Sequence, residues 1–108
     1  MSYKVFTTGN FEKEARRLIK KYGSLKNEIA GLIEDLQHNP TRGTHVNSNI
    51  YKIRLAVASK GKGKRGGARV MTFVKVTREE VYLFSIYSKG EKDDISQQEI
   101  NALIQDIQ

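Results

Sequence analysis

The chain has 108 residues and a mass of 12.3 kDa, which suffices for one domain over 1–108 and is too short for two separate cores. It contains no cysteine, which excludes disulfides, iron–sulfur centres, thiol nucleophiles and cysteine-based zinc sites. No apolar run approaches the roughly 20 residues of a membrane span, and the first residues lack a signal peptide's apolar core. We therefore expect a cytoplasmic protein with no membrane partner.

Positive charge is concentrated in the middle of the sequence. The chain has 19 Lys and Arg against 12 Asp and Glu, a net charge of +7. No acidic residue lies between Asp35 and Glu79, a stretch rich in lysine and arginine, whereas acidic residues predominate from Glu91 onward. Such an excess favours a polyanionic partner, which can be nucleic acid, an acidic protein or an anionic membrane surface.

The N-terminal part of the sequence predicts a strand followed by two helices. Residues 2–6 are β-prone, and Asn10 is a candidate N-cap for a helix over 11–22. Apolar residues repeat at helical spacing there and again over 25–36, with a Gly-Ser pair between the two segments. Pro40 prevents the second helix from continuing. The pattern indicates a helical hairpin.

After the proline the apolar period changes from helical to two-residue spacing. Residues 41–49 are polar and turn-rich, and residues 51–57 then alternate as in a half-buried strand. The segment 60–67 is too rich in glycine and like charge to favour regular structure. Two further strands are predicted over 68–76 and 81–87. Short connections favour an antiparallel meander of these three strands.

The last predicted element is a helix with a distinct start signal. Ser96 and Glu99 have the spacing of a capping box, in which each side chain satisfies the other's backbone amide. Apolar residues then form one stripe along the helix, whose partner is either the protein's own sheet or another chain. The element order is β-α-α-β-β-β-α, an α+β fold with helices packed on a small antiparallel sheet.

Familiar catalytic signatures are missing from the sequence. It has no nucleophile elbow and no Walker-type phosphate loop. His38 and His45 have no carboxylate placed to complete a metal site, and paired carboxylates occur only at adjacent positions, where side chains diverge. We expect no metal and no cofactor.

A set of basic residues is the best candidate for a functional site. Lys52 and Arg54 are two apart on one strand and therefore share a face, which with its cations and alanines is not expected to be a core face. Arg69 opens the next strand, but the sequence leaves open whether it shares that face. Like charges facing one another across a sheet are destabilising without an anion, and phosphate is a plausible one. Tyr82 and Tyr87 on the last strand can stack with unpaired bases.

Three motifs give the sequence a resemblance to a known family. Tyr-Lys-Ile-Arg-Leu stands at 51–55, a glycine-rich basic run ends in Gly-Gly-Ala-Arg-Val at 60–70, and Ile-Tyr-Ser-Lys-Gly-Glu-Lys-Asp-Asp-Ile-Ser stands at 86–96. Together they resemble the RelE/HigB toxins, particularly the HigB-like branch. The resemblance implies the RelE fold and a ribosome-dependent endoribonuclease. Such a toxin cuts mRNA in the 30S decoding site and is silenced by a cognate antitoxin.

The resemblance also implies roles for individual residues. Lys52 and Arg54 match paired basic positions of the family, Arg69 its phosphate-contacting arginine, and Lys89 a basic position after the last strand. The further residues expected to bind RNA are Lys60, Lys62, Lys64, Arg65, Tyr82 and Tyr87. Two positions depart from the RelE pattern, because Gly90 stands where RelE-type members have arginine and Ser96 where RelE has a tyrosine. The RelE acid–base assignment therefore does not transfer intact.

The expected chemistry needs little from the protein, because the 2′-hydroxyl of RNA is the nucleophile. The protein must orient that hydroxyl, move two protons and stabilise the pentavalent phosphorus. Arginine stabilises charge but is a poor base, whereas a lysine crowded by other cations and partly desolvated can act as one. We therefore expect Lys52 or Lys89 to be the base, Arg69 to hold the phosphate and Arg54 to support transition-state charge.

Two alternative functions remain open at the level of sequence. A ParE-like inhibitor of DNA gyrase has the same fold but does not need the basic cluster of Lys52, Arg54 and Arg69. A non-catalytic domain that binds RNA or the ribosome needs only the charge and the tyrosines. Product analysis distinguishes the last alternative from the enzyme, since only cleavage yields a cyclic phosphate and a free 5′-hydroxyl.

Overall fold

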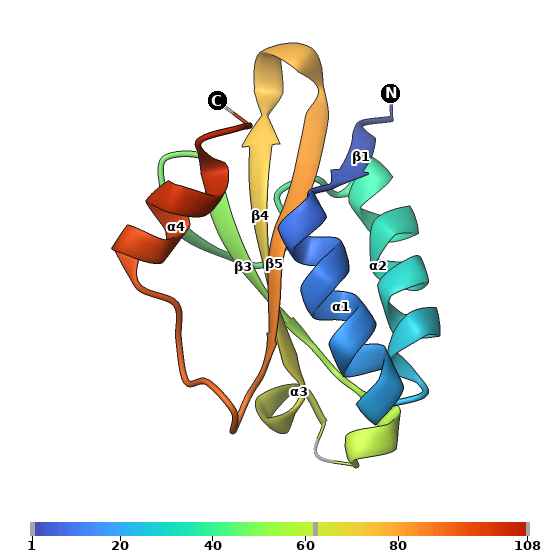
Figure 1. Cartoon of the computed structure of the whole chain (residues 1–108). Coiled ribbons are helices and arrows are strands. Elements are labelled where there is room, and N and C mark those ends of the chain that lie inside the picture. Colours follow the sequence, from blue (N-terminus) through green and yellow to red (C-terminus); the bar gives the residue numbers. More distant parts are fainter. Residues whose placement is uncertain (1, 62, 108) are drawn as a thin grey trace.

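The computed structural model describes residues 2–61 and 63–107, and Figure 1 shows a central sheet with helices packed on it. The strands are β1 (Lys4–Thr7), β2 (Thr44–Asn47), β3 (Ile50–Leu55), β4 (Ala68–Lys75) and β5 (Glu80–Ser88). The helices include α1 (Gly9–Lys21), α2 (Leu25–His38), a short α3 (Gly63–Gly66) and α4 (Gln97–Ile104). None of the helices in these ranges is long and apolar enough to cross a membrane.

The strands form one sheet in the order β1-β5-β4-β3-β2. The α+β class and the antiparallel meander of β3, β4 and β5 are confirmed. Two details correct the predicted order. Residues 41–49 are not all irregular, because β2 pairs antiparallel with β3 there. The sheet is also mixed rather than purely antiparallel, because β1 runs parallel to β5 at the opposite edge.

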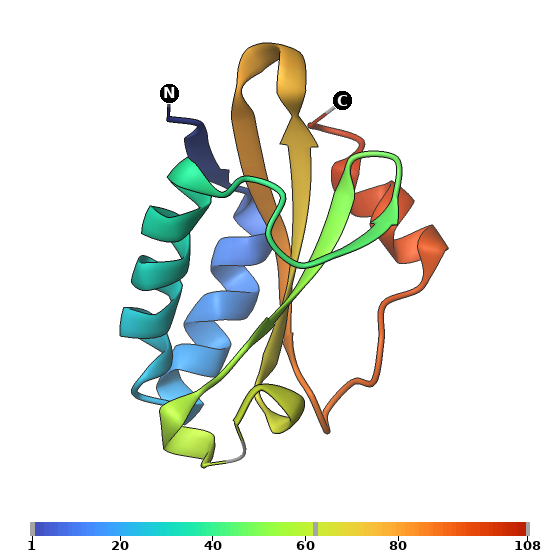
Figure 2. The ribbon, with the colours of Figure 1, turned by 180° about the vertical axis from the view of Figure 1, so that it is seen from behind.

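The helical hairpin of α1 and α2 covers one face of the sheet (Figures 1 and 2). Its apolar stripes meet inward-facing residues of β3, β4 and β5, so the spacing that predicts the two helices also defines their buried sides. The helical part of this core consists of Phe11, Ala15, Leu18, Leu25, Ile29, Leu32 and Leu36.

α1 begins earlier than the sequence indicates, and the prediction that Asn10 is its N-cap is wrong. Thr8 has the extended backbone of an N-cap, and its hydroxyl accepts a hydrogen bond from the Phe11 amide at 3.2 Å. The Thr8 amide itself donates to the Leu83 carbonyl on β5, which fixes the start of the helix against the sheet. Asn10 lies inside the first turn, where its side chain is available for another task.

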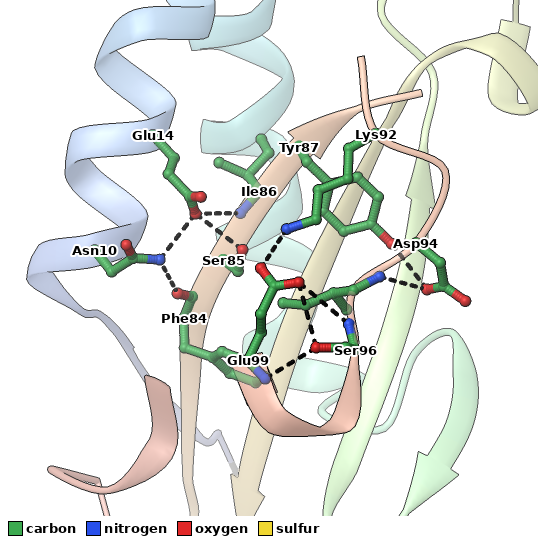
Figure 3. A network of polar contacts seen from close by, with 11 residues as sticks. Asn10, Glu14, Phe84, Ser85, Ile86, Tyr87, Lys92, Asp94, Ser96 and Glu99 are labelled. Atoms are coloured by element: carbon green, nitrogen blue, oxygen red, sulfur yellow. Dashed lines mark hydrogen bonds and ion pairs between the residues drawn. The ribbon is translucent and has the colours of Figure 1, made fainter. Parts of the chain in front are cut away.

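α4 covers the opposite face of the sheet and begins with the predicted capping box. The Ser96 hydroxyl accepts from the Glu99 amide at 3.1 Å, and the Glu99 carboxylate accepts from the Ser96 amide at 3.4 Å (Figure 3). The apolar stripe of α4 packs on the protein's own sheet, where Ile100 and Ile104 belong to a second core.

This second core corrects the prediction that the Lys52 face of β3 is not a core face. Ile50 points to the same side of β3 as Lys52 and is buried with Met71 and Phe73 beneath α4. That side of the sheet is therefore apolar at the Ile50 end and basic only from Lys52 onward. Sequence alternation alone misses this because Ile50 lies just before the stretch that alternates.

The glycine-rich basic segment is more ordered than its composition predicts. It contains the end of a 3-10 turn over Ala58–Lys60 and the short helix α3. Lys62 and the side chain of Lys64 lie outside the part of the chain that the structure describes. At Gly67 a Cβ atom would lie 2.1 Å from the Leu55 carbonyl oxygen, so only glycine lets the chain pass this close to β3 as β4 begins.

Candidate functional site

Pairing between neighbouring strands places the predicted basic residues together. Arg54 on β3 lies directly opposite Arg69 on β4, and Arg69 lies opposite Tyr87 on β5. Directly opposed residues of antiparallel strands point to the same face. Lys52, two residues before Arg54, points there too. The structure thus settles what the sequence leaves open: Arg69 shares the face of Lys52 and Arg54. We call these three residues and Tyr87 the basic cluster.

A β-bulge turns Tyr87 toward this cluster. Met71 pairs with Ser85 and Thr72 with Leu83, so Phe84 is an extra residue on β5. An extra residue reverses the alternation of the strand beyond it. Consequently Ile86 faces the α1–α2 core, whereas Tyr87 faces the side of α4. Sequence reasoning missed the bulge. Its signal is the three-residue spacing between Leu83 and Ile86, since apolar residues on one face of a regular strand are an even number of residues apart.

Side chains of α1 satisfy the backbone of the bulge (Figure 3). The Asn10 amide donates to the Phe84 carbonyl at 3.0 Å, and one Glu14 oxygen accepts from the Ile86 amide at 3.2 Å and from the Ser85 hydroxyl at 2.9 Å. β1 pairs with β5 only as far as Leu83. Beyond that residue, side chains of α1 in place of β1 form hydrogen bonds with this edge of β5. The polar edge of the bulged strand is thereby covered.

Within the basic cluster, Arg54 and Arg69 differ in accessibility. Arg54 is exposed, whereas Arg69 is only 6% exposed. The Arg69 guanidinium donates to the Arg65 carbonyl at 3.0 Å and to the Ala68 carbonyl at 3.3 Å. Arg69 therefore forms the floor of the cluster beneath the turn of α3, and Arg54 is its exposed arginine.

Asp94, which the sequence does not single out as a site residue, contacts two residues of the basic cluster. One of its carboxylate oxygens accepts from Lys52 Nζ at 3.3 Å, from the Tyr87 hydroxyl at 3.3 Å and from the Ile95 amide at 2.8 Å. The Ile95 amide, together with Lys52, holds the pKa of Asp94 below its ordinary value. Burial and the nearby Asp94 carboxylate raise the pKa of Tyr87 to about 12. At neutral pH Asp94 is thus a carboxylate and Tyr87 a protonated phenol.

A shallow groove of about 280 Å³ lies beside the cluster and adds one cation to it. Its lining includes Lys52, Arg54 and Arg42. Arg42 is also paired with Asp35 at 3.0 Å. Gly43 shapes the wall, because it has φ +106° and a Cβ there would lie 2.5 Å from the Lys52 carbonyl oxygen. Sequence reasoning did not assign a role to Arg42, since β2, which carries the chain from Arg42 toward β3, was not predicted.

Two predicted RNA-binding residues, Tyr82 and Arg65, and the predicted catalytic residue Lys89 lie outside the cluster. Tyr82 stacks with Phe6 at a centroid distance of 5.1 Å and pairs with Phe73, five residues along β5 from Tyr87. Arg65 is exposed on α3. Lys89 is half-exposed and pairs with Asp93 at 3.5 Å. The Tyr87 ring is 4% exposed with Lys92 above it, so its hydroxyl rather than its ring face is presented to the cluster.

Lys60 is directed into the fold rather than toward the cluster. Its ammonium donates to the Ser88 hydroxyl at 2.8 Å, the Lys89 carbonyl at 2.9 Å and the Gly67 carbonyl at 3.3 Å. It also lies 5.3 Å from the centre of the Tyr22 ring. These contacts join the start of β4 to the end of β5.

No three His, Asp or Glu side chains within residues 2–61 and 63–107 are grouped so that they could hold a metal ion.

Comparison with known proteins identifies the family. A family model described as the RelE toxin of the RelE/RelB toxin–antitoxin system matches residues 3–106. The chain belongs to the RelE toxin family. This confirms the resemblance at the family level, and the assignment to a HigB-like branch stays a prediction.

Solved structures of RelE toxins share the fold at low sequence identity. An E. coli RelE variant with two arginines replaced by alanine, in the free state, matches with a TM-score of 0.65 and 15% identity, covering 100% of both chains. The isolated E. coli RelE toxin matches with a TM-score of 0.52 and 19% identity over 99% of this chain and 100% of that one. A chain of the RelBE2 toxin–antitoxin complex of Mycobacterium tuberculosis matches with a TM-score of 0.56 and 16% identity, covering 82% and 92%.

Proposed function

We propose that this RelE-family chain is the toxin of a toxin–antitoxin pair and that it cleaves mRNA on the ribosome. The observation that carries the proposal is the pairing of Arg54 with Arg69 across β3 and β4, with Lys52 on the same face. Two arginines directly opposed on a sheet repel each other unless an anion lies between or above them. A phosphate of RNA meets that requirement.

The residues of the cluster divide the chemistry of cleavage among them. The 2′-hydroxyl of the RNA attacks the adjacent phosphorus, forms a cyclic phosphate and expels the 5′-oxygen of the next nucleotide. Arg54 stabilises the charge on the pentavalent phosphorus, and Arg69, directly opposite Arg54 in the sheet, adds its positive charge to the phosphate site. Lys52 or Lys89, in its neutral amine form, removes the proton from the 2′-hydroxyl, and the departing 5′-oxygen takes up a proton from a protonated side chain of the site. Tyr87 is protonated at neutral pH and acts as a hydrogen-bond donor.

An acidic antitoxin is the partner that we propose for the basic surface. The chain has a net charge of +7, and its exposed cations include Arg54 beside the groove. A protein of opposite charge over this surface would neutralise the cations and exclude RNA from them. The RelBE2 complex shows that a chain of this fold is accommodated in a toxin–antitoxin assembly.

The test is to induce the chain in growing bacteria and map new mRNA 5′ ends against the reading frame. We expect in-frame cuts with cyclic-phosphate and 5′-hydroxyl termini. Arg54→Ala should reduce cleavage by about 10²- to 10³-fold, because it removes a charge that stabilises the transition state. Arg69→Ala and Arg69→Lys should reduce it as well. Arg78→Ala is the matched control, since Arg78 is an exposed arginine on the turn between β4 and β5.

Three results would contradict the proposal. Full cleavage by folded Arg54→Ala and Arg69→Lys proteins would remove the basic cluster from the mechanism. Growth arrest with intact messages would favour inhibition of gyrase, as in ParE-like relatives of this fold. Binding to ribosomes or RNA without new 5′ ends would indicate a non-catalytic RNA-binding domain. Thermal denaturation of each purified variant separates loss of activity from loss of folding, a necessary control for the buried Arg69.

A further inference from the structure

The unbound protein places one of its own anions on the basic cluster. The Asp94 carboxylate accepts hydrogen bonds from Lys52 Nζ and from the Tyr87 hydroxyl through the same oxygen, each at 3.3 Å. The two donors come from β3 and β5, which lie on either side of β4. Both belong to the face on which Arg54 and Arg69 are paired. An oxygen held between an ammonium and a phenol in this way is in a position suited to an oxygen of a phosphate.

The segment that carries Asp94 is attached to the rest of the protein at several points. Glu91 lies between Arg17 and Lys21 of α1, with both ion pairs at 2.8 Å, and Asp93 is paired with Lys89 at 3.5 Å. These contacts hold residues 91–94 near the cluster without depending on Asp94. The Asp94 side chain can therefore leave Lys52 while the segment stays anchored.

The contact between Asp94 and Lys52 is weak enough to be displaced. The Asp94 side chain is 66% exposed, and exposed ion pairs contribute little net stability. Protonation does not release it at neutral pH, because the Ile95 amide and Lys52 hold the pKa of Asp94 below its ordinary value. A stronger anion in the same position can displace it, and a phosphate oxygen also gains the attraction of Arg54.

We propose that Asp94 is an internal competitor of RNA: on binding, an oxygen of an RNA phosphate takes the place of its carboxylate on Lys52 and Tyr87. This inference rests on the proposed function, because it takes the substrate of the basic cluster to be RNA. It adds that the site is self-occupied in the unbound protein and that Asp94 lowers the affinity for RNA. No covalent step is involved, since one acceptor replaces another.

Asp94→Asn is the variant that isolates the charge. Asparagine keeps an oxygen that can accept from the Ile95 amide and the Tyr87 hydroxyl, so the local backbone is preserved. The matched control is Asp106→Asn, which changes the net charge equally at an exposed position after α4. The probe is a 2′-O-methyl RNA hexamer, which lacks the attacking hydroxyl and cannot be cleaved by this route. Its affinity is measured by fluorescence anisotropy, and backbone amide shifts are followed by NMR.

We expect Asp94→Asn to bind the hexamer about two- to fivefold more tightly than the original protein. This factor corresponds to the free energy of one exposed ion pair, which RNA no longer has to break. Asp106→Asn should bind as the original does. In the original protein the amide of Ile95 should shift on titration, as its acceptor Asp94 moves away. Equal or weaker binding by a folded Asp94→Asn protein would overturn the inference and indicate that Asp94 positions Lys52 and Tyr87 instead. Lack of binding by both proteins would overturn it too.

The outcome of this binding experiment does not depend on whether the protein cleaves mRNA. Hexamer binding does not require ribosomes or cleavage, so tighter binding by Asp94→Asn would support the competitor role even if no mRNA were cut. Conversely, in-frame cleavage that depends on Arg54 would stand even if Asp94→Asn left the affinity unchanged. A lower KM for mRNA cleavage by Asp94→Asn is the further result expected when both proposals hold.

Discussion

At the scale of single residues, Lys60 illustrates how a residue of a basic loop acquires a structural role. A lysine in a run of glycine and like charge is ordinarily solvated. Here its ammonium serves three acceptors at Gly67, Ser88 and Lys89, where β4 begins and β5 ends. Those strand ends flank Arg69 and Tyr87. Lys60 therefore supports the basic cluster by holding together the two strand ends that carry Arg69 and Tyr87. This role does not require contact with RNA.

This role predicts the effect of Lys60→Met. The free energy of unfolding should fall by about 2 kcal/mol, because the substitution removes a charged donor from partly buried acceptors. Lys26→Met, at an exposed lysine of α2, should change stability by less than about 0.5 kcal/mol. Urea denaturation measures both values. If Lys60 instead contacts an RNA phosphate, the free energy of unfolding of Lys60→Met would be unchanged. The slope of log affinity for RNA against log salt concentration would then fall by about one unit, the loss of one phosphate contact.

At the scale of elements, the bulge in β5 decides which residues form the site. Without the bulge, regular alternation from Leu83 through Phe84 would present Ile86 toward α4 and Tyr87 toward α1 and α2. Asn10 and Glu14 of α1 support the bulge, because they pair with the Phe84 carbonyl and the Ile86 amide on the edge of β5 beyond β1. A helix on one face of the sheet thus controls the residues displayed on the other.

Glu14→Ala tests the support of the bulge. The change removes the acceptor of the Ile86 amide and of the Ser85 hydroxyl, so the free energy of unfolding should fall by about 2 kcal/mol. Faster hydrogen exchange at Ile86 should accompany the loss, because its amide is then unpaired. The comparison is Glu34→Ala at an exposed position of α2, with an expected change below about 0.5 kcal/mol. Equal stabilities of the two variants would show that Glu14 does not hold the bulge.

At the scale of the whole molecule, the acidic C-terminal stretch folds back over basic elements. Glu91 is paired with α1, and Asp94 reaches β3. In Figure 1 the stretch passes from the end of β5 around the sheet to α4. The basic middle and the acidic end of the sequence are thus brought into contact, which orders the connection before α4 and covers part of the basic cluster.

The Glu91 pairs predict how stability depends on pH. The hydrogen bonds and charges of Arg17 and Lys21 lower the pKa of Glu91 from its ordinary value of 4.5 to about 2. A carboxylate whose pKa is lowered by folding stabilises the folded state above its unfolded pKa, and this contribution is lost as the pH falls through the folded value. Because the pairs are exposed, the contribution is about 1 kcal/mol.

Glu91→Gln should therefore be less stable than the original protein by about 1 kcal/mol at pH 7. The difference should decrease between about pH 4.5 and pH 2, the interval between the two pKa values. Chemical denaturation at a series of pH values measures it, with Glu34→Gln on exposed α2 as the control for loss of an acidic residue. A difference that does not change with pH would mean that Glu91 contributes through packing alone.

Local patterns in the sequence determined most of the fold. The apolar spacing of α1 and α2, the alternation in β3 and the capping box at Ser96 each depend on residues close together in the chain. Such patterns act through backbone geometry and amphipathicity, which are properties of a single element. The three motifs around Lys52, Arg69 and Lys89 also sufficed to indicate the family that the comparison confirms.

The composition of the site was decided only by the tertiary structure. Strand register places Arg69 beside Arg54, the bulge turns Tyr87 toward both, and the return of the acidic segment brings Asp94 to Lys52. The physical reason is that register and bulges depend on how the two sheet faces share their apolar residues between α1, α2 and α4. That division is a balance over distant parts of the chain, so no local stretch of sequence contains it.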